Sequence, residues 1–223
     1  MKAIIIAEGR GDLAVLSNIL KGALDIDLSD IKFQTPEYEY DQTDLFQMNA
    51  TEFGGWNMVK KSCGTNEEIE IFLEFHDRSI FIVQIDSAER TEVGYEVLEP
   101  IKSESIDYCE IVKKNIALKI NEWLNDKFTD KIAYAICVEE IESWLMTLLM
   151  LENTSKHNNP KNKYFFELNR KLTGKARNIL SEKDVFKQYL KLSHEFSKKK
   201  YLEKYIKKNK SFEIFYDRLI ELQ

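Results

Sequence analysis

KAIIIAEGRGD, at residues 2–12, opens the chain with a short apolar run, an acid and two glycines. Its β-branched isoleucines favour a buried strand, which Gly9 and Gly11 end. From Asp12 onward, leucines recur at positions 13, 16, 20 and 24, which is the spacing of an amphipathic helix. The sequence therefore predicts a strand, a glycine turn and a helix at the start of the chain.

Two later apolar runs have the character of the first. They read SIFIVQI at 79–85 and KIAYAICV at 131–138. Helical spacing of apolar residues precedes each run, over 69–76 and 109–124, and another helix is expected from residue 141. Strands that alternate with helices predict an α/β fold with a mostly parallel sheet flanked by helices.

The remaining segments give weaker patterns. Residues 31–53 predict one or two further strands, and Phe53 to Trp56 predict a turn. Residues 152–163 are polar and predict a surface linker, after which the sequence favours only helices. We therefore expect an α/β domain at 1–152 and an all-helical, basic extension at 153–223 that packs on it.

Composition excludes several classes of protein. The 223 residues are 43% hydrophobic, with only eight Gly and three Pro, which excludes a disordered or collagen-like chain. The longest apolar stretch, Trp144 to Leu151, is too short to cross a membrane, and no signal peptide is expected. Three widely spaced cysteines form no CxxC pair and argue against disulfide and zinc frameworks. The expected location is the reducing cytoplasm.

The net charge of −6 hides a strong asymmetry along the chain. Residues 1–155 contain 14 Lys or Arg and 30 Asp or Glu, whereas residues 156–210 contain 17 and 5. A basic segment supplies sequence-independent attraction for nucleic acid phosphates. The candidate contacts are Lys199, Lys200, Lys204, Lys207 and Lys208, beside Tyr201 and Tyr205, which could stack on bases. The alternative is an ordinary helical surface with lysines in water and tyrosines in the core.

A carboxylate follows each of the three apolar runs that predict strands. Glu8 and Asp12 follow the first, Asp86 and Glu89 follow the second, and Glu139, Glu140 and Glu142 follow the third. In a parallel sheet these acids meet at one edge, where ligands of α/β proteins bind. Carboxylates without His or Cys are suited to Mg²⁺ or Mn²⁺. Such an ion positions and polarises a phosphate ester for attack.

Each acid also has a structural alternative. Glu139, Glu140 and Glu142 would be favoured in a first helical turn by the helix dipole alone, and Asp86 could cap the turn after its strand. The coincidence at three strand ends nevertheless favours a site.

The order of these residues resembles the Toprim-domain superfamily. Glu8-Gly9-Arg10-Gly11-Asp12 is similar to the first Toprim motif, Glu-Gly-x-x-Asp, and Asp86 after its strand is similar to the second. Glu140 to Leu145 (EIESWL) resembles the Glu-x-Trp-Leu helix of small bacterial RloB-like proteins, which are Toprim-like proteins related to the OLD type. Gly54-Gly55-Trp56 and Ser211 to Phe215 resemble segments of a neighbouring uncharacterised family.

This resemblance implies a division of roles among the acids. Glu8 would be the general acid or base, and Asp86 and Glu142 would hold Mg²⁺ or Mn²⁺. Asp12, Glu89 and Glu140, which lie beside them in the sequence, are the further candidate metal ligands. One position departs from the family, because the second motif is Asp-x-Asp and this chain has Ala88 in place of the second acid. The nearest acid, Glu89, lies one position after the place of the second Asp of the motif.

The expected function is a metal-dependent nuclease that hydrolyses phosphodiester bonds in DNA or RNA, with Glu8 and Asp86 as catalytic residues. The resemblance implies a role in bacterial phage defence and control by a partner ATPase. Two alternatives stay open. One is a catalytically degenerate module that senses nucleic acid or a partner protein, which the alanine at position 88 favours. The other is an enzyme that acts on a small phosphorylated molecule.

Overall fold

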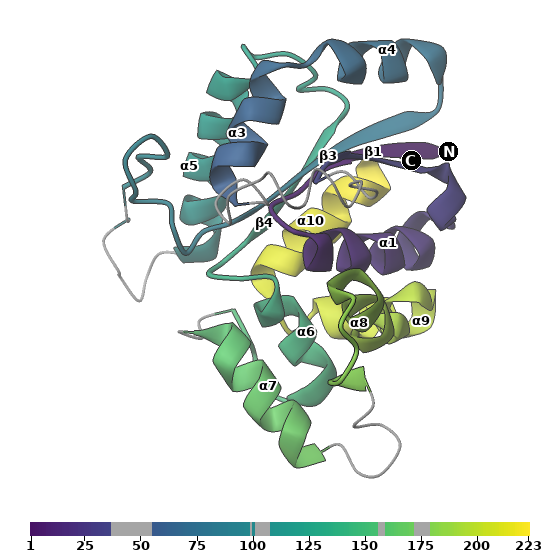
Figure 1. The fold of residues 1–223 in the computed structure, drawn as a ribbon, viewed down its shortest axis with the longest axis vertical. Helices are drawn as coiled ribbons and strands as arrows, with labels where there is room; N and C mark the ends of the chain where they lie inside the picture. Colours follow the sequence, from purple (N-terminus) through teal and green to yellow (C-terminus); the bar gives the residue numbers. More distant parts are fainter. Residues whose placement is uncertain (37–54, 99, 101–107, 156–158, 172–178) are drawn as a thin grey trace.

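The computed structural model describes residues 1–36, 55–98, 100, 108–155, 159–171 and 179–223. Four strands form one sheet in the order β2-β1-β3-β4, and every neighbouring pair is parallel. The strands are β1 (Lys2–Ile6), β2 (Ile31–Thr35), β3 (Ser79–Asp86) and β4 (Ile132–Cys137). Figure 1 shows this sheet crossing the middle of the molecule between layers of helices.

Alternate residues of the strands feed two hydrophobic cores. On one face, Ile4, Phe81 and Ile136 pack with α3 (Trp56–Gly64), α4 (Glu67–Phe75) and α5 (Tyr108–Trp123). On the other face, Ile5, Ile82 and Ala135 pack with the remaining helices. These are α1 (Arg10–Leu24), α6 (Glu142–Leu149), α7 (Pro160–Lys171), α8 (Val185–Leu192), α9 (Lys199–Ile206) and α10 (Lys210–Glu221).

The strand order places a switch point at β1. The chain leaves β1 for β2 on one side and later returns to β3 on the other, with α1 and α3 on opposite faces. In doubly wound sheets, a crevice forms outside the carboxyl ends of the two strands at such a point. Here those strands are β1, which is followed by Glu8, and β3, which ends at Asp86.

The expected α/β architecture with a parallel sheet is confirmed, and so are the three strong strands and the helices that alternate with them. Of the weak pattern over 31–53, residues 31–35 form β2, whereas 37–53 lie outside the described residues.

Two local predictions were wrong, and a third is described only in part. Residues 53 and 54 of the turn expected over 53–56 lie outside the described residues, Gly55 precedes α3 with a φ of 86°, and Trp56 is the first residue of that helix. The linker expected to reach residue 163 ends earlier, because α7 begins at Pro160, a residue that suits the first helical position. Glu139 and Glu140 lie in the connection after β4, and only Glu142 is in the first turn of α6.

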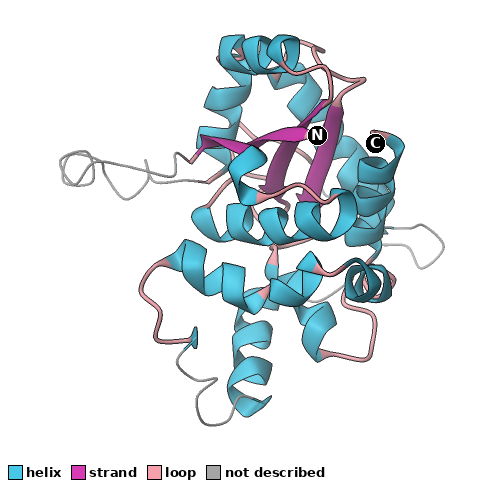
Figure 2. Ribbon diagram, turned by 90° about the vertical axis from the view of Figure 1, so that its right-hand side faces the viewer, coloured by secondary structure: helices cyan, strands magenta, loops and turns pink. Residues whose placement is uncertain are grey.

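The C-terminal helices complete the hydrophobic core of the sheet. Trp144 of α6 stacks on Phe212 and Phe215 of α10, with ring centroids 4.6 and 5.4 Å apart, and its indole N–H donates to Ser211 Oγ at 2.7 Å. Figure 2 shows the helices below the sheet as one continuous stack. The described residues from 153 onward form helices and the connections between them, and these helices share a core with β1, β3 and β4.

Among the described residues, no helix combines the length and the apolar character needed to span a bilayer. Cys63, Cys109 and Cys137 are all buried and unbridged.

Candidate active site

A hydrogen-bonded chain joins the ends of β1 and β3. The Glu8 backbone N–H donates to Gln84 Oε1 at 2.9 Å, and Gln84 Nε2 donates to Asp86 Oδ1 at 2.8 Å. The Asp86 backbone N–H donates in turn to Glu8 Oε1 at 2.8 Å. Gln84 is fully buried. These bonds fix the two carboxylates beside each other at the switch point of the sheet.

Asp12 is held by the glycine turn that precedes it. Its carboxylate folds back over Gly9, where a Cβ would lie only 3.0 Å from Asp12 Oδ2, and it accepts a backbone hydrogen bond from Gly9. Asp12 is only 8% exposed although it lies in the first turn of α1. Glycine at position 9 therefore leaves the space that the Asp12 carboxylate occupies.

Glu142 reaches the same edge from α6. It is 3% exposed, and its Oε1 accepts a hydrogen bond from the phenol of Tyr189 in α8. The ammonium group of Lys161, in α7, lies 4.0 Å from the same oxygen. Both partners of this carboxylate therefore come from the helices of the C-terminal segment.

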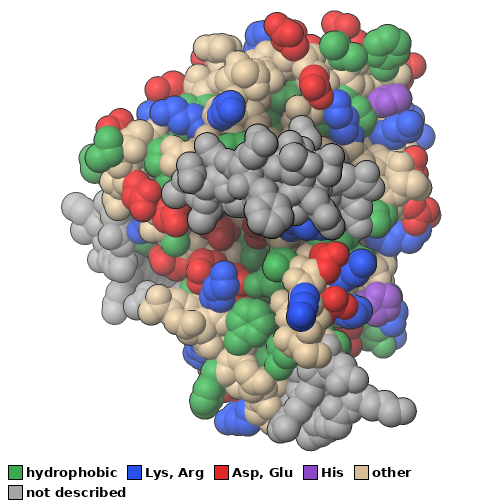
Figure 3. All heavy atoms as spheres, in the orientation of Figure 1, with side chains coloured by type: hydrophobic (Ala, Val, Ile, Leu, Met, Phe, Trp, Pro, Cys, Tyr) green, Lys and Arg blue, Asp and Glu red, His purple; other side chains and the backbone are tan. Residues whose placement is uncertain are grey.

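The remaining predicted acids lie at the rim. Glu89 is exposed and Glu140 is half-buried, and Glu140 Oε2 accepts the backbone N–H of Lys161 at 3.2 Å. Glu139 lies 3.8 Å from Arg90 Nη1. Acidic and basic side chains are mixed over the face shown in Figure 3, and acidic ones gather near its middle, below the segment drawn in grey.

The buried carboxylates raise one another's pKa. Burial, and then the neighbouring charges, raises the pKa of Glu8 to about 8 and that of Asp12 to about 7. Burial and the charges of Asp12, Glu8 and Glu142 hold the pKa of Asp86 well above its ordinary value. The pKa of Glu142 is also raised by burial, although the Tyr189 hydrogen bond opposes the shift. Carboxylates that are buried together repel one another, which raises their pKa values and favours either protonation or the binding of a cation.

The donor set has the chemistry of a hard divalent cation site. Glu8, Asp12, Asp86 and Glu142 offer only carboxylate oxygens, as Mg²⁺ and Mn²⁺ prefer. In the described part of the chain, however, no three His, Cys, Asp or Glu side chains are grouped as they would be around one ion. Instead, one carboxylate oxygen of Glu8 and one of Glu142 accept hydrogen bonds from protein groups. A metal would require some of these side chains to rotate.

The turn after β3 contains Ser87 and Ala88, and its bonds show the surroundings of position 88. The Ser87 hydroxyl is buried and accepts the Glu139 backbone N–H at 2.8 Å, and the Ala88 N–H donates to the Glu139 carbonyl at 3.1 Å. Ala88 itself is exposed. Position 88 therefore ties two connections together through its backbone and contributes no oxygen ligand.

The basic candidates divide into two groups. Lys199, Lys200 and Lys204 are exposed on α9, and Tyr201 beside them is 41% exposed. Lys208 instead donates to the carbonyls of Thr147 and Met150 at 2.9 and 2.8 Å, at the end of α6.

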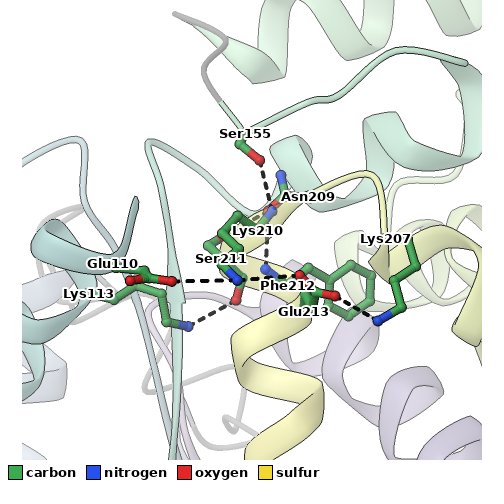
Figure 4. A network of polar contacts seen from close by, with 9 residues as sticks. All are labelled: Glu110, Lys113, Ser155, Lys207, Asn209, Lys210, Ser211, Phe212 and Glu213. Atoms are coloured by element: carbon green, nitrogen blue, oxygen red, sulfur yellow. Dashed lines mark hydrogen bonds and ion pairs between the residues drawn. The ribbon is translucent and has the colours of Figure 1, made fainter. Parts of the chain in front are cut away.

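Lys207 has an exposed side chain that is paired with an acid. It lies 2.7 Å from Glu213 in the network at the start of α10 (Figure 4). In the same network the buried Lys113 of α5 donates to the Ser211 carbonyl at 2.9 Å. Tyr205 is 9% exposed and donates a hydrogen bond to Glu195. Its ring is therefore packed in the core and is not free to stack on a base.

Comparisons with protein-family models, with curated proteins and with solved structures found no match.

Three residues at the site were not anticipated from the sequence, namely Gln84, Lys161 and Tyr189. Gln84 had a visible signal, because it is a polar residue that interrupts the apolar residues of the run SIFIVQI. Lys161 and Tyr189 had none, because only the packing of α7 and α8 brings them to Glu142.

Proposed function

We propose that this protein is a metal-dependent phosphodiesterase of the Toprim-like type that acts on DNA or RNA. We base this on the convergence of Glu8, Asp12, Asp86 and Glu142 at the carboxyl edge of a parallel sheet, where Glu8, Asp12 and Glu142 each raise the pKa of Asp86. A Mg²⁺ or Mn²⁺ ion bound there would supply charge neutralisation and would polarise the phosphate ester.

The side chains of the site are suited to proton transfer, metal binding and phosphate binding. Glu8 is suited to take or give the proton of the attacking water, because its pKa of about 8 lies near neutral pH, where acid–base catalysis is most efficient. Asp12, Asp86 and Glu142 supply oxygen ligands, with Glu89 and Glu140 at the rim. Lys199, Lys200 and Lys204 offer exposed positive charge for the phosphate backbone.

The test is cleavage of labelled DNA and RNA, single- and double-stranded, with Mn²⁺ and with Mg²⁺. Glu8→Gln and Asp86→Asn should each lower the rate at least about 100-fold, the scale of a lost acid–base group. Glu74→Gln, an exposed acid on α4, is the matched control and should cleave at the wild-type rate. Equal rates in all four proteins would refute the site.

A second candidate is a binding module that senses nucleic acid or a partner without cutting. It is favoured by Ala88 at the place of the second acid and by the lack of a preformed group of three ligands in the described residues. Calorimetry separates the two, since a sensing module should take up neither Mg²⁺ nor Mn²⁺ at millimolar concentration.

Charge reversal at Lys200 and Lys204 should weaken action on nucleic acid and spare action on a small phosphorylated molecule. Control by a partner ATPase and a place in phage defence remain part of the proposal, carried by the resemblance of the motifs.

A further inference from the structure

The helix α8 lies against both helices that bring carboxylates to the site. Its Tyr189 donates a hydrogen bond to Glu142 of α6, and the same ring lies against Gly11 of α1, one residue before Asp12. A Cβ at Gly11 would lie 3.2 Å from the Tyr189 ring. One side chain therefore contacts the backbone beside one acid and the carboxylate of another.

Further contacts fix α8 on α1 along its length. Asn18 Nδ2 donates to the Leu190 carbonyl and to Ser193 Oγ, both at 2.8 Å, and these atoms are buried or partly buried. At the other end of α8, Asp184 lies 3.7 Å from Arg10 and caps its own helix by accepting the Lys187 N–H. These contacts between α1 and α8, some of them buried and polar, hold the Tyr189 ring between α1 and α6.

We propose that Tyr189 is a positioning residue, which sets the place of the Glu142 carboxylate relative to Asp12 and so makes the C-terminal segment part of the site. This inference rests on the proposed function, since it assigns Tyr189 to the same metal-binding carboxylates. By holding Glu142 Oε1, the phenol fixes the orientation of the carboxylate group and therefore the position of Oε2. Groups that orient metal ligands in this way commonly change metal affinity when they are removed.

The test is Mn²⁺ binding to the full-length chain, measured by calorimetry and by the electron paramagnetic resonance signal of free Mn²⁺. Tyr189→Phe keeps the ring against Gly11 and removes only the donor, so it should fold normally and bind Mn²⁺ about tenfold more weakly. Tyr164→Phe is the matched control, because Tyr164 is also buried near Glu142 but has no hydrogen bond to it. It should bind Mn²⁺ like the wild type.

A second variant addresses the ring contact. Gly11→Ala places a methyl group against the Tyr189 ring and should also weaken Mn²⁺ binding, without removing any polar group. In cleavage assays, excess Mn²⁺ should restore much of the rate of Tyr189→Phe, whereas a merely unfolded variant would not recover.

The outcomes separate the two proposals. If the wild type binds Mn²⁺ and Tyr189→Phe binds it equally well, the role of Tyr189 is refuted and the proposed function stands. If the wild type binds no Mn²⁺, the metal site fails, and the positioning role fails with it. A tenfold loss in Tyr189→Phe alone supports both.

Discussion

At the scale of single residues, buried polar atoms decide the behaviour of this site. Asp12 and Gln84 are almost or fully buried, and Asp12 is bonded to the Gly9 backbone whereas Gln84 is bonded to Asp86. A buried polar group without a partner is costly, and a buried charge is more so. Substitutions here should therefore change stability in directions that the hydrogen bonds and the pKa shifts specify.

The first prediction concerns pH. Folding raises the pKa of Asp12 from 3.8 to about 7, so between these values the folded protein keeps a proton that the unfolded chain has released. The free energy of unfolding should therefore fall as the pH rises across this window, by up to ~1.4 kcal/mol per pH unit for one group. Asp12→Asn should flatten this dependence and be the more stable protein at pH 8.

Urea unfolding at several pH values between 4 and 8, in metal-free buffer, measures this effect. Asp130→Asn serves as the control, because Asp130 is exposed. Parallel curves for wild type and Asp12→Asn would show that another group takes up the proton.

The second prediction concerns Gln84. Gln84→Leu leaves the Glu8 N–H and one oxygen of Asp86 without their buried partner. The free energy of unfolding should fall by about 1–3 kcal/mol, which is the usual cost of such unpaired groups. Chemical denaturation checks the value, and Gln223→Leu at the exposed chain end should change it little. A Gln84→Leu protein as stable as the wild type would contradict the role of this link.

At the scale of elements, the basic segment serves two purposes. Residues on the outer face of α9 are exposed, whereas Lys208, just beyond the helix, binds the carbonyls at the end of α6. Helix C-termini are stabilised by such cations because their last carbonyls have no partner within the helix. The same residue type therefore has different roles a few positions apart.

The third prediction separates these roles. Lys208→Met should lower the free energy of unfolding by about 1–2 kcal/mol, since two carbonyl contacts are lost. Lys200→Met should change stability by less than about 0.5 kcal/mol but weaken binding to a DNA or RNA oligonucleotide and reduce its salt dependence. Thermal melts and fluorescence anisotropy at two salt concentrations measure the two effects. An unstable Lys200→Met protein or an unaffected Lys208→Met protein would contradict this division.

At the scale of the whole molecule, the sheet depends on the end of the chain. Its α1 face is covered in part by α10, whose Phe212 and Phe215 are fully buried against Trp144. The expected domain boundary near residue 152 therefore falls inside a shared core, although the composition changes there. An α/β sheet with one face left open would expose a large apolar surface.

The fourth prediction follows from this shared core. A chain that ends at residue 152 should not fold cooperatively, because the apolar residues that face α8 and α10 would lie in water. Circular dichroism melting and the dispersion of amide signals in NMR spectra check this. Adding residues 153–223 as a separate chain should restore the transition if the two parts reassemble. A cooperative melt of the short chain alone would show that its α/β part is an independent domain.

The sequence by itself determined the alternation of strands and helices, because apolar runs such as SIFIVQI and leucines at helical spacing are local signals. It also predicted that Glu8 and Asp86 meet at one edge of the sheet, since a parallel sheet gathers its strand ends there. Only the tertiary structure decided that Gln84 links them and that Lys161 and Tyr189 meet Glu142. The bond from Glu8 to Gln84 depends on the pairing of β1 with β3, and the contacts of Glu142 depend on how α7 and α8 pack. These contacts join residues far apart in the chain, which no local pattern encodes.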